Sequence, residues 1–95
     1  MRIDLFLKRS RIIKQRDAAK KACDQGMVSI SGRPAKPGHQ VAAKDIVVVE
    51  WPHRRLEFEV SDVPSGNVSK DRAQSLYVVL SDERLGDETS EFTAL

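Results

Sequence analysis

RDAAKKACDQGMVSISGR, residues 16–33, is the stretch that decides the fold of this 95-residue chain. Its first ten residues predict a helix with small side chains on one side and charged side chains on the other. The small residues are Ala18, Ala19, Ala22 and Cys23. Gly26 supplies the left-handed residue that ends such a helix. Residues 27–30 then alternate as in a strand, and Ser31 with Gly32 predicts a tight turn.

A second helix is predicted upstream, over residues 2–8. Ile3, Phe6 and Leu7 recur at positions i, i+3 and i+4 and form one apolar stripe. Asp4 and Lys8 lie off that stripe, at the spacing of a weak i, i+4 ion pair. The chain therefore begins with two short helices that are joined by a basic connection.

Downstream of the turn, the pattern changes from helical to extended. Residues 33–38 contain two prolines and predict a loop, since proline cannot serve in a central strand. The remaining predicted elements are strands over residues 45–50, 56–60 and 76–80 and a short helix over residues 70–75 that is capped by Ser69.

These elements predict the α+β class, with two N-terminal helices packed on a small, mostly antiparallel sheet. A chain of 95 residues has room for one domain, which we expect over residues 1–85. Its core motif covers about residues 1–50, and the C-terminal strands and short helix cover residues 51–85. Residues 86–95 are acidic and rich in Ser and Thr, and they are predicted to form a disordered tail.

The positive charge of the chain is concentrated at its N-terminus, although the net charge is only +2. Residues 1–21 hold eight basic side chains against two acidic ones, whereas residues 51–95 hold five basic against nine acidic. The basic side chains are the candidate RNA-binding residues: Arg2, Lys8, Arg9, Arg11, Lys14, Arg16, Lys20 and Lys21. Charge alone leaves two interpretations open, a solvated helix face or a surface that binds nucleic acid.

Several function classes fit the sequence poorly. The single cysteine, Cys23, excludes a disulfide within the chain and a cysteine metal cluster, and it is typical of a cytoplasmic protein. His39 and His53 are isolated and lack the partners of a catalytic or metal site. Residues 1–8 lack the apolar stretch expected of a signal peptide, and the apolar runs of the sequence are too short for us to expect a membrane span. We therefore expect neither an enzyme nor a cofactor.

The order of the elements resembles the S4 RNA-binding domain over residues 1–50. The matching segments are residues 2–7 (RIDLFL), Ser10 with Arg11, the small residues of the second helix, residues 25–33 (QGMVSISGR) and residues 45–48 (DIVV). Ser31, Lys44 and Leu5 depart from the family pattern. Ser31 and Lys44 affect turns, and Leu5 stands where a basic residue is frequent, so that one RNA contact is lost. The resemblance implies that the two helices present basic residues to the backbone of helical RNA.

Within that resemblance the arginines and lysines have different roles. Arg2, Arg11 and Arg16 suit bidentate contacts to phosphate, whereas Lys14, Lys20 and Lys21 add point charges. If the two helices pack through their apolar stripes, the heads of Arg2 and Arg16 are expected to converge on one surface.

Over residues 1–86 the chain is similar to the RqcP family, the small S4 factors of bacterial ribosome-associated quality control. Residues 8–16 (KRSRIIKQR) and 76–86 (LYVVLSDERLG) carry this closer likeness. It implies a protein that binds large-subunit rRNA and peptidyl-tRNA and supports C-terminal alanine tailing with RqcH, a NEMF-family partner. It also implies that Arg2 and Arg16 contact RNA where rRNA and tRNA meet. We expect a monomer off the ribosome.

Two alternatives remain open at this point. The small ribosome-associated heat-shock S4 proteins share the two helices but carry a longer, basic helical tail, which the acidic residues 86–95 do not match. From another class, the chain could be a protein adaptor whose basic face docks an acidic partner without RNA.

Overall fold

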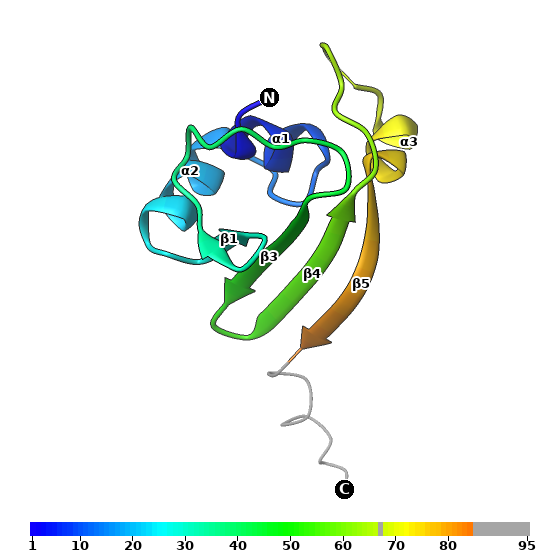
Figure 1. Ribbon diagram of the computed structural model, residues 1–95. Helices are drawn as coiled ribbons and strands as arrows, with labels where there is room; N and C mark the ends of the chain where they lie inside the picture. Colours follow the sequence, from blue (N-terminus) through cyan, green and yellow to red (C-terminus); the bar gives the residue numbers. More distant parts are fainter. Residues whose placement is uncertain (67, 85–95) are drawn as a thin grey trace, which may run out of the picture.

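The protein is a two-layer α+β structure, as the sequence predicts (Figure 1). The computed structural model describes residues 1–66 and 68–84, and the predicted tail over residues 86–95 lies outside them. The helices are α1 (Ile3–Arg9), α2 (Arg16–Asp24) and α3 (Lys70–Ala73), and a 3-10 turn (Gln74–Leu76) follows α3. The strands are β1 (Val28–Ile30), β2 (Arg33–Pro34), β3 (Ile46–Trp51), β4 (Arg54–Val60) and β5 (Tyr77–Arg84).

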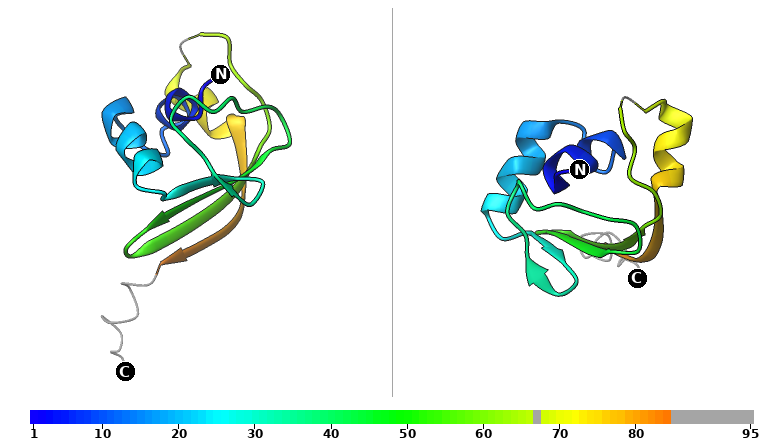
Figure 2. Two further views of the ribbon diagram at one scale, coloured as in Figure 1. Left: turned by 60° about the vertical axis from the view of Figure 1, so that its left-hand side comes forward. Right: turned by 45° about the horizontal axis from the view of Figure 1, so that its top comes forward.

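The five strands form one antiparallel sheet in the order β2-β1-β3-β4-β5. All three helices lie over the same face of that sheet, with α1 between α2 and α3 (Figure 2, right). The alternate residues of β3 and β4 explain this arrangement, because Val47, Val49, Leu56, Phe58 and Val60 are buried and their neighbours are not. One sheet face therefore carries the core and the other faces solvent.

Aromatic and small residues connect the helical layer to the sheet. The ring of Phe6 stacks on that of Phe58, with centroids 6.2 Å apart, and Tyr77 meets Phe58 edge-on at 5.4 Å. On α2, Ala19 and Cys23 are buried, so the helix packs closely through short side chains. Ala18 was predicted on this buried side, but it is exposed because it lies about 100° around the helix from Ala19.

The two glycines in the deciding stretch take the conformations that their positions require. Gly26 follows α2 with φ of +76°, and its amide donates to the Cys23 carbonyl at 3.0 Å. Ser31 and Gly32 both have positive φ and join Ile30 to Arg33 in a two-residue turn. These findings confirm the predicted helix end and tight turn.

Two strands differ from the sequence prediction. Arg33 and Pro34 were predicted as loop but form β2, which proline permits because β2 is an edge strand with a partner on one side only. The last strand was predicted to end at Leu80, but it continues to Arg84. Its polar second half is held by backbone pairing with β4, down to Arg54 opposite Arg84. That long-range pairing has no signal in a local hydropathy pattern.

Residues 35–45, which connect β2 to β3, secure the start of α1. The amide of Ile3 donates to the His39 carbonyl at 2.7 Å, and that of Asp4 donates to the Pro37 carbonyl at 3.3 Å. In return, the Val41 amide donates to the Met1 carbonyl at 2.9 Å. The first amides of a helix lack partners within it, so this loop satisfies them and fixes the N-terminal end of α1 in place.

Candidate nucleic-acid interface

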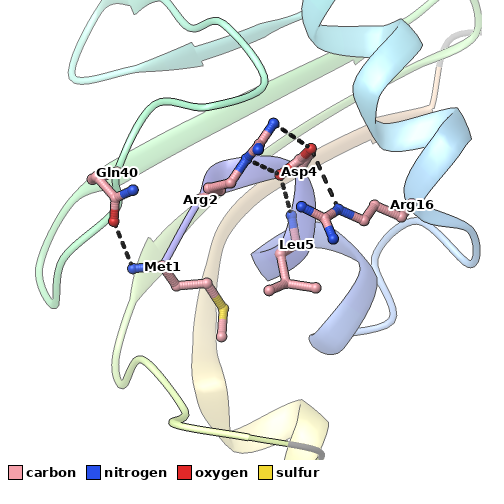
Figure 3. Close-up of polar contacts among 6 residues, drawn as sticks. All are labelled: Met1, Arg2, Asp4, Leu5, Arg16 and Gln40. Carbon is pink, nitrogen blue, oxygen red and sulfur yellow. Dashed lines mark hydrogen bonds and ion pairs between the residues drawn. The ribbon is translucent and has the colours of Figure 1, made fainter.

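The N-terminal ends of α1 and α2 meet at a buried carboxylate (Figure 3). Asp4 is 1% exposed, and two arginine heads reach it from different helices. Arg2 Nε lies 3.2 Å from Asp4 Oδ1, and Arg16 Nε lies 3.5 Å from Asp4 Oδ2. Oδ1 also accepts a hydrogen bond from the Leu5 amide at 2.7 Å. We call Arg2, Asp4 and Arg16 the Asp4 cluster.

The two arginines of the Asp4 cluster each keep part of the guanidinium in solvent. Their side chains are 44% and 47% exposed, although both contact a buried acid. Each guanidinium has five N–H donors in a planar fork, and the contacts to Asp4 occupy only some of them. The remaining donors can bind a phosphate oxygen, while Asp4 holds both heads in position.

The cluster confirms one prediction and corrects another. Arg2 and Arg16 converge on one surface, as expected from the packing of the two helices. The predicted ion pair of Asp4 with Lys8 is wrong, because Asp4 lies buried between the two arginines and Lys8 is exposed. Sequence reasoning missed Asp4 because it lies one position after Ile3, on the edge of the apolar stripe, where a buried acid has no distinguishing pattern.

A groove lies at the other end of α1. Its volume is about 640 Å³, within the roughly 300–1,000 Å³ typical of ligand sites. We call it the basic groove, and its lining residues are Lys8, Arg9, Arg11, Lys14, Val68 and Lys70. Four of the predicted RNA-binding residues therefore lie together here. Lys70 was not predicted, since only the folding of α3 beside α1 brings it next to the basic connection.

The last two predicted residues, Lys20 and Lys21, belong to neither group. Both are exposed on α2. Lys21 lines a separate hollow of about 240 Å³ together with Gln25 and Trp51, among others. Lys20 lies one turn after Arg16, so it can add charge beside the Asp4 cluster.

The sheet face away from the helices carries the opposite charge. Outward positions of β3, β4 and β5 hold Glu50, Glu57, Glu59 and Glu83, against a single outward Arg55. Arg55 itself contacts Glu50 and Glu57, each at 3.5 Å. The uneven distribution of charge along the sequence therefore gives the molecule a basic helical side and an acidic sheet side.

Comparison with known proteins assigns the family. A family model described as the S4 domain matches residues 1–47. A Bacillus subtilis (strain 168) protein named RQC P-site tRNA stabilizing factor is 37% identical over 87 residues, which cover 92% of this chain and 100% of that protein. The chain belongs to the RqcP family. A second member, from Halalkalibacterium halodurans, is 39% identical over 83 residues, covering 87% of this chain and 93% of that protein.

Solved structures agree with the fold of this RqcP-family chain. The solution structure of the hypothetical protein HP1423 superposes with a TM-score of 0.75 at 27% identity, covering 87% of this chain and all of that one. The trimeric structure of Vibrio cholerae Heat Shock Protein 15 gives 0.78 at 23% identity, covering 85% and 82%. The latter likeness shows the shared S4 fold alone.

The family assignment settles the broad class of the protein. RqcP-family proteins are S4-type RNA-binding factors and not enzymes, in agreement with the prediction from the sequence. None of the helices in residues 1–66 and 68–84 has the length and apolar character that crossing a membrane requires.

Proposed function

We propose that this protein is a cytoplasmic ribosome-associated quality-control factor that binds large ribosomal subunits carrying peptidyl-tRNA. In that role it supports C-terminal alanine tailing together with RqcH, and it is a monomer off the ribosome. The observation that carries the proposal is the match to the RqcP family over nearly the whole chain, since the names of these relatives assign them to P-site tRNA.

The charge distribution supports this proposal. Helical RNA is recognised mainly through its shape and its phosphates, and the helical side of the molecule presents eight basic residues to such a backbone. The proposed RNA contacts are Arg2, Lys8, Arg9, Arg11, Lys14, Arg16, Lys20 and Lys21. We further propose that residues 1–85 act as one RNA-binding domain and that residues 86–95 are an appended acidic tail.

Two arginines are proposed to contact RNA at a junction. Arg2 and Arg16 come from different helices and meet at one carboxylate, so the exposed parts of their heads are close together. Such a pair can bind two neighbouring phosphates, or one phosphate from each of two RNA strands. Placement where rRNA and tRNA approach each other would use both heads at once.

Co-sedimentation with purified large subunits tests the binding step. We expect binding to subunits that carry peptidyl-tRNA and weaker binding to empty subunits, because the tRNA supplies part of the RNA surface. Each phosphate contact should add roughly 0.7–0.9 to the slope of log affinity against log salt. A flat salt response, or equal binding to both particles, contradicts the proposal.

A cellular measurement tests the link to tailing. Deleting the gene should shorten or remove alanine tails on a stalled reporter to the extent seen when RqcH is deleted, and the double deletion should add nothing further. Unchanged tails would exclude the tailing role. Ribonuclease treatment of the sedimented complex separates RNA binding from an adaptor role, since only a protein-mediated contact would survive it.

A further inference from the structure

The basic groove is built from two halves of the chain. Lys8, Arg9, Arg11 and Lys14 come from the end of α1 and the connection to α2, within the S4 match. Val68 and Lys70 come from the segment that enters α3, outside that match. The groove is thus a feature that residues 1–47 cannot form alone.

The position of Lys70 is fixed by the packing of its surroundings. Ser69 caps α3, with its hydroxyl accepting from the Arg72 amide at 3.2 Å. Ala73 and Leu76 are fully buried and anchor the helix to the core. Lys70 itself occupies the first position of this four-residue helix and is exposed. Its charge is therefore accessible to a ligand in the groove that it lines.

The cations of the groove have no acidic partner in the described parts of the chain. No ion pair within residues 1–66 and 68–84 involves Lys8, Arg9, Arg11, Lys14 or Lys70. Arg72, two residues after Lys70, does pair with Asp62 at 2.9 Å. Five positive charges that line one groove repel each other, so an anion that enters it relieves that repulsion.

Arg9 adds a second, independent observation. Its Nε and Nη1 atoms are shielded from solvent, yet they have no hydrogen-bond partner among the described residues. Shielded donors without partners are costly, since they have lost water and gained nothing. An anion that enters the groove offers oxygen acceptors to a side chain with such donors.

We propose that the basic groove binds the phosphate backbone of RNA, with Lys70 as a contact from outside the S4 match. This inference rests on the proposed RNA-binding function and extends it to the C-terminal half of the chain. The groove and the Asp4 cluster lie at opposite ends of α1, roughly 10 Å apart along its axis. One RNA backbone can therefore contact both sites, and membership in a family of S4-type RNA-binding factors favours RNA over an acidic peptide.

Lys70→Ala tests the proposal, with Arg72→Ala as the matched control. Both remove one positive charge from α3, but only Lys70 lines the groove. Each variant is titrated with large subunits carrying peptidyl-tRNA and with a fluorescent RNA hairpin of unrelated sequence. Lys70→Ala should weaken binding to both RNAs about fivefold and lower the salt slope by roughly 0.7–0.9. Arg72→Ala should leave the slope unchanged.

The outcomes separate this inference from the function on which it rests. If Lys70→Ala binds as the wild type does, with the same slope, the groove is not an RNA site although the ribosomal role stands. If the wild type binds the hairpin but not the subunits, and Lys70→Ala loses hairpin affinity, the groove stands and the ribosomal role fails. Displacement of the hairpin by poly-glutamate at equal charge concentration would overturn the preference for RNA.

A rescue variant covers the case in which Lys70→Ala unfolds. Lys70→Arg keeps the charge and should retain the affinity and the slope, whereas Lys70→Gln removes the charge but keeps a polar side chain and should lower both. Thermal melting of each variant confirms that it is folded. Equal binding by the Arg and Gln variants would overturn the proposal.

Discussion

The two ends of α1 hold arginines in opposite circumstances. At the N-terminal end, Arg2 and Arg16 already contact a buried carboxylate. At the C-terminal end, Arg9 and its neighbours in the basic groove have no acidic partner among the described residues. The first site is organised before any ligand arrives, whereas the second is a concentration of positive charge around a hollow.

This difference implies a division of work along α1. An arginine head that Asp4 holds in place loses little conformational entropy when it binds phosphate. The Asp4 cluster should therefore contribute contacts that are already oriented for binding. The groove attracts any polyanion within a screening length that the ionic strength sets. Its contribution to the affinity should therefore decrease as the salt concentration rises. Variants at the two ends should therefore change different measured quantities.

Replacing both arginines of the Asp4 cluster should have the largest effect on stability. Arg2→Ala with Arg16→Ala leaves the Asp4 carboxylate buried without a cation, and urea denaturation should show a loss of about 2 kcal/mol. This is below the roughly 3–5 kcal/mol seen when a fully buried pair is broken, because both heads are half in water. Each single variant should lose about 0.5 kcal/mol, since the other arginine remains on Asp4.

The double-mutant cycle is the control for this prediction. A loss in the double variant well above the sum of the two single losses shows that the two arginines share one buried acid. Asp4→Asn keeps an oxygen for the Leu5 amide and removes the charge, so it should also abolish the coupling. Strictly additive losses would mean that the cluster does not act as a unit.

The single arginine variants should act mainly on binding. Arg2→Ala and Arg16→Ala remove no core volume, so both should stay folded and lose about 1.5–3 kcal/mol of affinity for large subunits. Arg2→Lys and Arg16→Lys should restore little of it, because lysine lacks the planar fork. Lys36→Ala, which removes an exposed charge outside both sites, is the control. Normal binding by the folded alanine variants would place the RNA site elsewhere.

Local patterns were enough to predict the framework of this comparison. The small residues of α2, the glycine after it and the apolar stripe of α1 each predict their element without reference to distant residues. The convergence of Arg2 and Arg16 followed from packing those two stripes together. Charge counting along the chain found four of the five cations in the groove.

The contacts that sequence reasoning missed all depend on tertiary structure. Asp4 looks like a surface acid until two helices enclose it, and Lys70 looks like an ordinary helix lysine until α3 lies beside α1. β2 and the second half of β5 are held by pairing with neighbouring strands rather than by their own hydropathy. Each of these features depends on segments far apart in the chain.

A variant in the basic groove should change the salt dependence of RNA binding and have little effect on stability, in contrast to variants of the Asp4 cluster. Lys14→Ala removes an exposed cation that makes no ion pair in the described parts of the chain. Its unfolding free energy should stay within about 0.5 kcal/mol of the wild type, as for most surface substitutions. The slope of log affinity against log salt should fall by roughly 0.7–0.9. A loss of affinity with an unchanged slope would mean that Lys14 acts through geometry, like the Asp4 cluster.

The smallest effect on RNA binding is expected at Arg54, which is also held by a carboxylate but lies on another part of the molecule. Its Nε and Nη2 donate to the two oxygens of Asp82 at 2.9 and 3.0 Å, and its head lies 5.2 Å from the centroid of the Trp51 ring. Arg54→Ala should therefore cost about 0.5–1 kcal/mol of stability and leave RNA affinity unchanged. If RNA affinity falls as it does for Arg2→Ala, then being held by an acid, rather than lying at the ends of α1 and α2, is what makes an arginine an RNA contact.

The stability effect of Arg54 carries its own pH signature. The hydrogen bonds from Arg54 hold the pKa of Asp82 below its ordinary value. A lowered carboxyl pKa means that the contribution of the pair is complete above the ordinary pKa and is lost as the pH falls through the lowered one. The stability difference between wild type and Arg54→Ala should thus be constant near neutral pH and shrink in acid. A difference that persists unchanged below the lowered pKa would assign the stabilisation to the stacking of Arg54 on Trp51 instead.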